Sequence, residues 1–320
     1  MILVIYKEEL AYQKNREEIC FLNKFDTSNN YLIISLDDIT KNININEIND
    51  LNDIIKIYQK INDNITHLFF YPRQVKIINN DKIYKLIAEF PVKKTIYIDD
   101  LHHPDYNIDI INKFDYKLLP YHYTIKLMPK LNPVNIIKFP HYINDFYIKE
   151  PTQNRNIQVS VLGHYNKKPY AMRRLFINET NKVNEKLKFC KITAFKEEVP
   201  NSKYYEVLQN SFASIATSLD KRNYYFPYLV SKYFEIPGCG ALLLAHVLPE
   251  FEEEMIRCGF IDNVNYIKFK TEDEFIEKCN YAFYPNNKEI IEKIRINGYE
   301  LVKNNHLSSN RIHQIINLFS

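Results

Sequence analysis

Residues 232–244 read KYFEIPGCGALLL, a short stretch in which a helical segment, a tight turn and an apolar strand follow one another. The helical part carries Lys232 and Glu235, and the turn is formed by Gly238, Cys239 and Gly240. A helix that runs through a glycine turn into a buried strand is typical of βαβ units. Glycine also lets a ligand come close to the main chain, so this stretch is the first candidate for a binding site.

The same alternation of short β-branched runs and helical periodicity extends over the whole chain and predicts an α/β protein with parallel sheets. In the N-terminal half we expect strands at 1–6, 31–36, 67–71, 95–98, 116–119 and 135–139. In the C-terminal half we expect strands at 157–162, 187–192, 212–218, 241–245 and 266–269. Helices are expected at 9–25, 48–61, 74–90, 169–181, 203–210, 225–234, 272–282, 288–303 and 310–319. Each half therefore has the makeup of one Rossmann-like domain.

The length of the chain favours two domains, because 320 residues exceed what one small core usually holds. The polar stretch 149–156 has the composition of a linker. We therefore expect a first Rossmann-like domain at 1–148 and a second one at 157–308. A last amphipathic helix at 309–320 is expected to pack back on the first domain.

The composition excludes several classes of protein. Lys and Arg number 42 against 39 Asp and Glu, whereas a dedicated nucleic-acid binder usually carries a clustered basic face. No stretch approaches the roughly 18 uncharged apolar residues of a spanning helix, and the first residues do not resemble a signal peptide. The five cysteines are odd in number and form no CxxC pair, which argues against a disulfide framework and a zinc knuckle. We expect a soluble, cytoplasmic protein, and its oligomeric state stays open.

Glycine is rare in this chain, and its positions sharpen the binding hypothesis. Three of the five glycines, Gly163, Gly238 and Gly240, lie at predicted strand-end turns of the second domain. A diphosphate is commonly bound by main-chain N–H groups at such turns, and ligands of open α/β sheets bind where these turns gather. The other interpretation is structural: Gly238 and Gly240 cap a helix and form a tight turn.

The stretch 232–244 resembles the signature of the spore-maturation-type (CgeB-like) glycosyltransferases. The common form of that signature is Arg-x-Phe-Glu-Ile-Pro-Ala-Cys-Gly, followed by a hydrophobic strand. Further segments similar to that family follow in the same order at 266–269, 271–275, 294–299 and 305–306. One more such segment, 204–211, precedes the signature. The resemblance extends over 157–319 and is weaker before that.

This resemblance implies a GT-B fold, in which two Rossmann-like domains face each other, with the donor on the C-terminal domain and the acceptor mainly on the other. Glu235 would bind the ribose hydroxyls, since a carboxylate is an acceptor-only group suited to a diol. Lys232 stands where the family usually has Arg and would balance charge on the leaving diphosphate. Gly163 would open a loop over the phosphates, with Arg173 or Arg174 as a further cation.

The rest of the donor site implied by the resemblance lies in the turn itself: Pro237, Gly238, Cys239 and Gly240. The implied reaction moves a hexose from a UDP- or GDP-sugar to a hydroxyl of a glycan, lipid-linked or protein acceptor. It needs no bound metal ion and no cofactor, because the nucleotide sugar is a substrate. One departure is Pro227, which replaces a second Glu found in many retaining GT-B enzymes, so retention or inversion stays open.

A base for the acceptor hydroxyl is expected in the first domain. The run Asp99-Asp100-Leu101-His102-His103 follows a predicted buried strand, at the carboxyl end where α/β sites form. Asp99 and His102 are the candidates for this role. The same run also fits a surface turn in which Asp caps a helix and the histidines face solvent.

Two other functions stay open at this point. A non-catalytic GT-B-like protein that binds a nucleotide or a glycan is consistent with Pro227 and with the sparse glycines. A metal-dependent hydrolase would use Asp99, Asp100, His102, His103 and His122, since carboxylate and imidazole bind divalent metals. Its usual ligand spacings, such as His-x-x-x-His on a helix, are absent from the sequence.

Overall fold

The computed structural model forms two compact units. It describes residues 2–6, 31–35, 51–53, 65–71, 81–98, 108–120, 129–163, 171–195, 199, 201–217 and 229–319. The first unit contains the described residues up to Pro140 and those from Gln314 onward, and the second unit runs from His141 to His313. The chain therefore divides before the stretch 149–156, which lies in the second unit.

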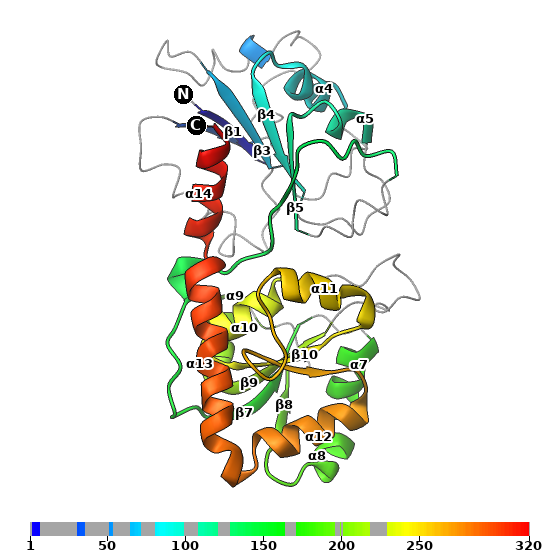
Figure 1. The fold of residues 1–320 in the computed structure, drawn as a ribbon, viewed down its shortest axis with the longest axis vertical. Coiled ribbons are helices and arrows are strands. Elements are labelled where there is room, and N and C mark those ends of the chain that lie inside the picture. Colours follow the sequence, from blue (N-terminus) through cyan, green and yellow to red (C-terminus); the bar gives the residue numbers. More distant parts are fainter. Residues whose placement is uncertain are drawn as a thin grey trace. The chain divides into compact units, whose positions relative to one another are not determined.

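The first unit is a parallel sheet with the strand order β2-β1-β3-β4-β5-β6 (Figure 1). Its strands are β1 (Ile2–Tyr6), β2 (Tyr31–Ser35), β3 (His67–Tyr71), β4 (Lys93–Tyr97), β5 (Tyr116–Leu119) and β6 (Ile136–Lys138). The helices α4 (Asp81–Glu89) and α5 (Ile108–Ile111) pack beside it. From the second residue on, β3 is buried at every position, as expected of a strand covered on both faces of a parallel sheet.

The second unit is a parallel sheet with the strand order β11-β10-β9-β7-β8 (Figure 1). Its strands are β7 (Ile157–Val161), β8 (Ile192–Ala194), β9 (Ser211–Thr217), β10 (Leu242–His246) and β11 (Ile267–Phe269). The neighbouring strands β7 and β9 place Ser160 opposite Ser214, and the two buried hydroxyl oxygens lie 2.8 Å apart. Their hydrogen bond satisfies two polar groups inside an otherwise apolar core.

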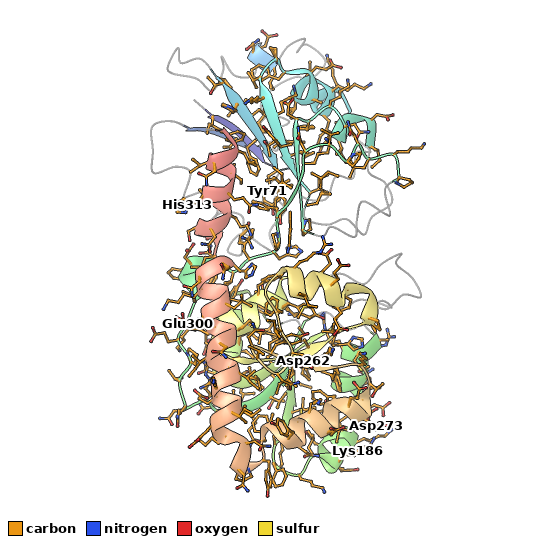
Figure 2. The ribbon with its side chains drawn as sticks, viewed as in Figure 1. Tyr71, Lys186, Asp262, Asp273, Glu300 and His313 are labelled. Atoms are coloured by element: carbon orange, nitrogen blue, oxygen red, sulfur yellow. The ribbon has the colours of Figure 1, made fainter. Side chains whose placement is uncertain are left out.

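Helices cover the second sheet and complete its core. They are α7 (Ala171–Asn178), α8 (Thr180–Lys186), α9 (Asn201–Gln209), α10 (Lys232–Gly238), α11 (Pro249–Arg257), α12 (Glu272–Ala282) and α13 (Lys288–Asn305). Apolar side chains of α7, α8, α12 and α13 pack on the strands in one continuous core. At the surface, Lys186 of α8, labelled in Figure 2, forms an ion pair with Glu272 of α12, with 2.8 Å between Nζ and Oε1.

The last helix, α14 (Ser308–Phe319), ends in the first unit, as the sequence predicts. The amide of Gln314 donates to the carbonyl of Lys138 at 2.9 Å, and the Phe319 ring lies 4.7 Å from that of His67. None of the helices among the described residues has the length and apolarity required to cross a membrane.

Several elements of the second unit differ from expectation. The strand predicted at 187–192 begins only at Ile192, because the Asn184 side chain binds both main-chain groups of Ile192 and α8 ends just before. The helix predicted at 225–234 begins only at Lys232 among the described residues and continues through Pro237 to Gly238, while 225–228 lie outside them. Helix α11 was missed, although Pro249 at its first position is a recognised start signal.

Candidate functional site

The order of the second sheet indicates where a ligand binds. Its winding changes direction between β7 and β9, because β8 lies outside β7 while β10 and β11 continue from β9 on the other side. In doubly wound sheets the ligand binds at such a switch point, beyond the carboxyl ends of the strands. Gly163 follows β7 at this edge, with a φ of 108° that L side chains rarely adopt.

Two cationic side chains converge on Gly163 from different helices. A Cβ built on Gly163 would lie 3.0 Å from Nζ of Lys232, at the start of α10. It would also lie 3.1 Å from Nη1 of Arg173, on α7, a side chain that is buried. Glycine therefore provides the space that both cations occupy. Two like charges brought so close repel each other, and an anion bound beside them is favoured.

Lys232 belongs to a hydrogen-bonded chain of three side chains. Its ammonium donates to the hydroxyl of Tyr204 at 2.9 Å and lies 4.3 Å from the centroid of that ring. The Tyr204 hydroxyl donates in turn to Oε2 of Glu235 at 2.5 Å. Glu235 is 1% exposed, so its charge is compensated inside the protein.

The second carboxylate oxygen of Glu235 is also engaged. It accepts the hydroxyl of Tyr205 at 3.3 Å, and the Tyr205 ring stacks on Tyr147 with centroids 3.7 Å apart. Two tyrosine hydroxyls thus occupy the positions that the resemblance assigns to the ribose hydroxyls. A direct bond from ribose to this carboxylate requires the side chains that bury it to move.

The Gly-Cys-Gly turn does not form the phosphate-binding surface that the sequence suggested. It precedes β10 and therefore lies at the amino edge of the sheet, away from the carboxyl ends of the strands. The N–H groups of Cys239, Gly240 and Ala241 donate to main-chain oxygens within the same stretch, and all three residues are buried. Expecting a diphosphate on these N–H groups was wrong, because none of the three points to a ligand.

The glycines of this turn are explained by close packing. A Cβ on Gly238 would lie 2.9 Å from the side chain of Ile143 and 3.2 Å from that of Val302 on α13. Gly240 has a φ of 69°, and its Cβ would lie 2.6 Å from the carbonyl oxygen of Lys149. The structural interpretation of these two glycines, a helix end and a tight turn, is thus the correct one. Pro237, the last residue before them, is buried inside α10.

Two arginines bind the carbonyl groups of the turn. Arg155 donates to the carbonyls of Cys239 and Ser211, and Arg295 donates to those of Gly240 and Thr152. Burial, followed by the charge of Arg295, lowers the pKa of Arg155 to about 10. The turn thereby joins the stretch that follows Lys149 to the core of the second unit.

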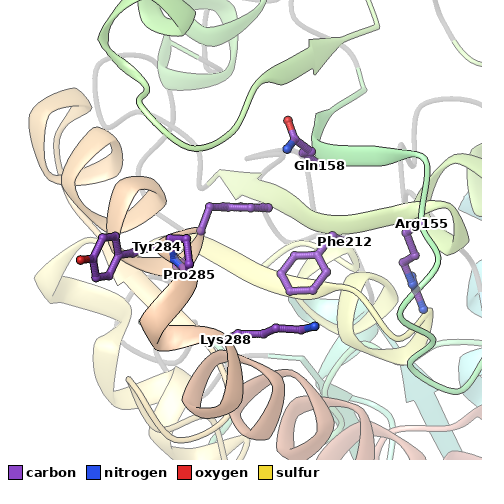
Figure 3. A pocket seen from close by; sticks show the side chains of 8 residues that line it. Arg155, Gln158, Phe212, Tyr284, Pro285 and Lys288 are labelled. Carbon is purple, nitrogen blue, oxygen red and sulfur yellow. The ribbon is translucent and has the colours of Figure 1, made fainter.

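A cavity of about 260 Å³ lies at the same amino edge (Figure 3). It is lined mainly by apolar side chains where β7 and β9 begin and α12 ends, together with three polar ones: Phe212, Ala282, Phe283, Tyr284, Pro285, Arg155, Gln158 and Lys288. It contains none of the predicted donor-site residues. Lys232 and Arg173 belong to the opposite edge, so this cavity is separate from their cluster.

Comparison with known proteins assigns the family. The pattern of the glycosyl transferase-like family matches residues 150–317, more than half of the chain. The chain belongs to this family. The predicted glycosyltransferase class is thus confirmed at family level, whereas the CgeB-like subtype stays a prediction. No curated protein matches this glycosyl transferase-like protein in sequence.

Solved structures of glycosyltransferases share its fold. A glycosyltransferase from Rickettsia africae has a TM-score of 0.65 at 13% identity, over 99% of this chain and 97% of that one. Anabaena HepE in complex with UDP has a TM-score of 0.65 at 10% identity, over 99% of both chains. The pneumococcal O-GlcNAc transferase GtfA, in complex with UDP and GlcNAc, has a TM-score of 0.54 at 10% identity. Here 79% of this chain covers 56% of the relative, so the chain spans little more than half of that transferase. The predicted GT-B fold of two Rossmann-like domains is confirmed.

The predicted base of this glycosyl transferase-like protein lies outside the described residues. Asp99 and His102 follow β4 in the sequence, as do Asp100 and His103, but none of the four is described. The same holds for His122 and Pro227. Within the described ranges, no three His, Cys, Asp or Glu side chains are grouped as metal ligands.

Gly163, Lys232 and Arg173, all predicted for the donor site, lie together, whereas the contacts of Tyr204 and Tyr205 with Glu235 were not predicted. These tyrosines were noted only as part of a segment similar to the family. In the sequence, the one feature that could have indicated these contacts is the pair of adjacent tyrosines on a helix that leads into β9. This pair does not predict that both hydroxyls reach Glu235, because Glu235 lies on a different helix.

Proposed function

We propose that this protein transfers a hexose from a UDP- or GDP-sugar to a hydroxyl acceptor, and that the donor's diphosphate binds between Lys232 and Arg173. The observation that carries this proposal is the convergence of two cations on Gly163 at the switch point of the second sheet. Relatives of the same fold whose structures contain UDP support a nucleotide diphosphate as the ligand.

The chemistry follows from charge. When the bond between the sugar and the diphosphate breaks, negative charge develops on the leaving phosphate oxygen. Lys232 and Arg173 stabilise this charge in a partly buried site, where the interaction is stronger than in water. Because two side chains supply the positive charge, we propose that transfer needs no divalent metal ion.

The acceptor hydroxyl loses its proton to a base, and we propose Asp99 or His102 for this role. Their position after β4 in the sequence supports it, since site residues follow the carboxyl ends of parallel strands. The acceptor is a glycan, a lipid-linked glycan or a protein. We place the reaction in the cytoplasm, which is consistent with the free thiols of Cys190, Cys239, Cys258 and Cys279.

The test is incubation of the full chain with a panel of UDP- and GDP-sugars, followed by measurement of released UDP or GDP. One donor should release its nucleotide slowly in water and faster with an acceptor, and EDTA should leave the rate unchanged. The same nucleotide should raise the stability by about 2.7 kcal/mol when present at 100 times its Kd.

The matched variants Lys232→Met and Lys186→Met remove one lysine each, the first at the site and the second on the surface of α8. Only the first should slow nucleotide release. Stabilisation without any release would support the alternative of a non-catalytic binding protein. Neither stabilisation nor release with any nucleotide of the panel would refute the proposal.

A further inference from the structure

We propose that Tyr204 is a positioning residue. Its hydroxyl donates to buried Glu235 and accepts from Lys232, and so fixes the ammonium group of Lys232 at the donor diphosphate. The inference rests on the proposed function, because it assumes that Lys232 binds the diphosphate. It assigns to Tyr204 a role that family membership does not specify.

The hydroxyl of Tyr204 lies between two groups that determine its orientation. A carboxylate only accepts hydrogen bonds and an ammonium only donates them. The Tyr204 proton must therefore point to Glu235, at 2.5 Å, which leaves the oxygen free to accept from Lys232 at 2.9 Å. Only this arrangement of the Tyr204 hydroxyl lets Lys232, Tyr204 and Glu235 all form their hydrogen bonds.

Burial makes this arrangement rigid. Tyr204 is 2% exposed and Glu235 is 1% exposed, so water does not compete for their hydrogen bonds. Lysine otherwise has a flexible side chain with large rotamer entropy. Nζ of Lys232 lies 4.3 Å from the centroid of the Tyr204 ring. This ring and the hydroxyl together fix the position of Nζ beside Gly163. Lys232 is thus oriented before a diphosphate arrives, which lowers the entropy cost of binding.

The neighbouring Tyr205 provides a matched control. It also lies on α9 and its hydroxyl also reaches Glu235, at 3.3 Å, but on the other carboxylate oxygen. Its ring stacks on Tyr147. Removal of the Tyr205 hydroxyl therefore takes one bond from the same carboxylate and leaves the bond from Tyr204 to Lys232 in place.

The experiment is a double-mutant cycle on the full chain, read as the Kd of the nucleoside diphosphate that the wild type binds, UDP or GDP, by calorimetry. Tyr204→Phe should raise this Kd about 5- to 10-fold, the size of an ordinary lost hydrogen bond. In the Lys232→Met background the same change should raise it less than about 2-fold, because the group that Tyr204 positions is gone. Tyr205→Phe should stay below about 2-fold in both backgrounds.

The outcomes separate the two proposals. A merely structural role of Tyr204 would weaken binding equally with and without Lys232, and that result would overturn the inference. An unchanged Kd in Tyr204→Phe would overturn it as well, while leaving the proposed function intact. A wild type that binds neither UDP nor GDP would overturn the proposed function and the inference together.

Discussion

At the scale of single residues, the proposed donor site depends on a glycine whose backbone conformation and whose missing side chain both matter. Gly163 has a φ of 108°, and a Cβ there would lie in tight contact with the ends of Lys232 and Arg173, at 3.0 and 3.1 Å. A side chain here would strain the main chain and push both cations apart. The backbone conformation at Gly163 therefore affects where the two positive charges lie.

Gly163→Ala should lower both the free energy of unfolding and the affinity for a nucleoside diphosphate. The strained φ costs about 1–3 kcal/mol, and displacement of the two cations should raise the Kd at least about 10-fold. Chemical denaturation and calorimetry measure the two effects.

Gly259→Ala is the control, because Gly259 has a φ of 83° and a Cβ there would meet only the end of the flexible Leu301 side chain. It should lower stability by a similar amount and leave nucleotide affinity unchanged. Equal affinity in both variants would contradict the placement of the diphosphate at Gly163.

At the scale of elements, the Gly-Cys-Gly turn is the point where α10, α13 and the stretch after Lys149 are joined. The backbone N–H of Lys149 donates to the carbonyl of Gly238 at 2.9 Å. Arg295, whose side chain is fully buried on α13, binds Gly240 and Thr152 and pairs with Glu292. The turn thus stabilises the second unit instead of binding a ligand.

Arg295→Met should destabilise the protein by about 2–3 kcal/mol, because it leaves two carbonyls and a partly buried carboxylate without their donor. Arg257→Met removes a surface arginine that pairs with Glu253. The Arg257 side chain is 37% exposed and that of Glu253 is 73% exposed, so this change should lower the free energy of unfolding by less than about 0.5 kcal/mol. Denaturant unfolding of both variants measures the difference. Similar losses in the two would show that the buried arginine does not join these elements.

At the scale of the whole molecule, each of the two units has its own parallel sheet and apolar core. The described cysteines are buried in the second unit. Cys190, Cys239, Cys258 and Cys279 are buried. Burial, and then the charge of Glu235, raises the pKa of Cys239; burial and the thiol of Cys190 raise that of Cys279. A raised pKa lowers the thiolate fraction at neutral pH, and only the thiolate is nucleophilic.

A Cys20→Ser variant should therefore show almost no reaction with 5,5′-dithiobis(2-nitrobenzoate) at pH 8 in the folded state. In denaturant, all four remaining thiols should react, since unfolding restores both exposure and the ordinary thiol pKa. Fast reaction of any of the four in the folded protein would contradict its buried position.

The sequence by itself determined the two parallel sheets and several exact boundaries. Strands 67–71 and 116–119 and the helix 272–282 begin and end where they were expected. Local periodicity specifies such elements, because it reflects which side chains of one segment are buried. The sequence order also implied that a turn before a strand lies at the amino edge of a parallel sheet. The sequence order therefore already places Gly240 at the amino edge.

Only the tertiary structure decided which side chains of different elements meet. Lys232 reaches Gly163 because the strand order places β9, which α10 follows, beside β7. Tyr204 reaches Glu235 because α9 and α10 pack against each other. Strand order and helix packing are set by contacts between segments far apart in the chain, which no local pattern contains. The sequence therefore predicted which residue types belong to the proposed donor site, but not the hydrogen bonds that join Lys232, Tyr204 and Glu235.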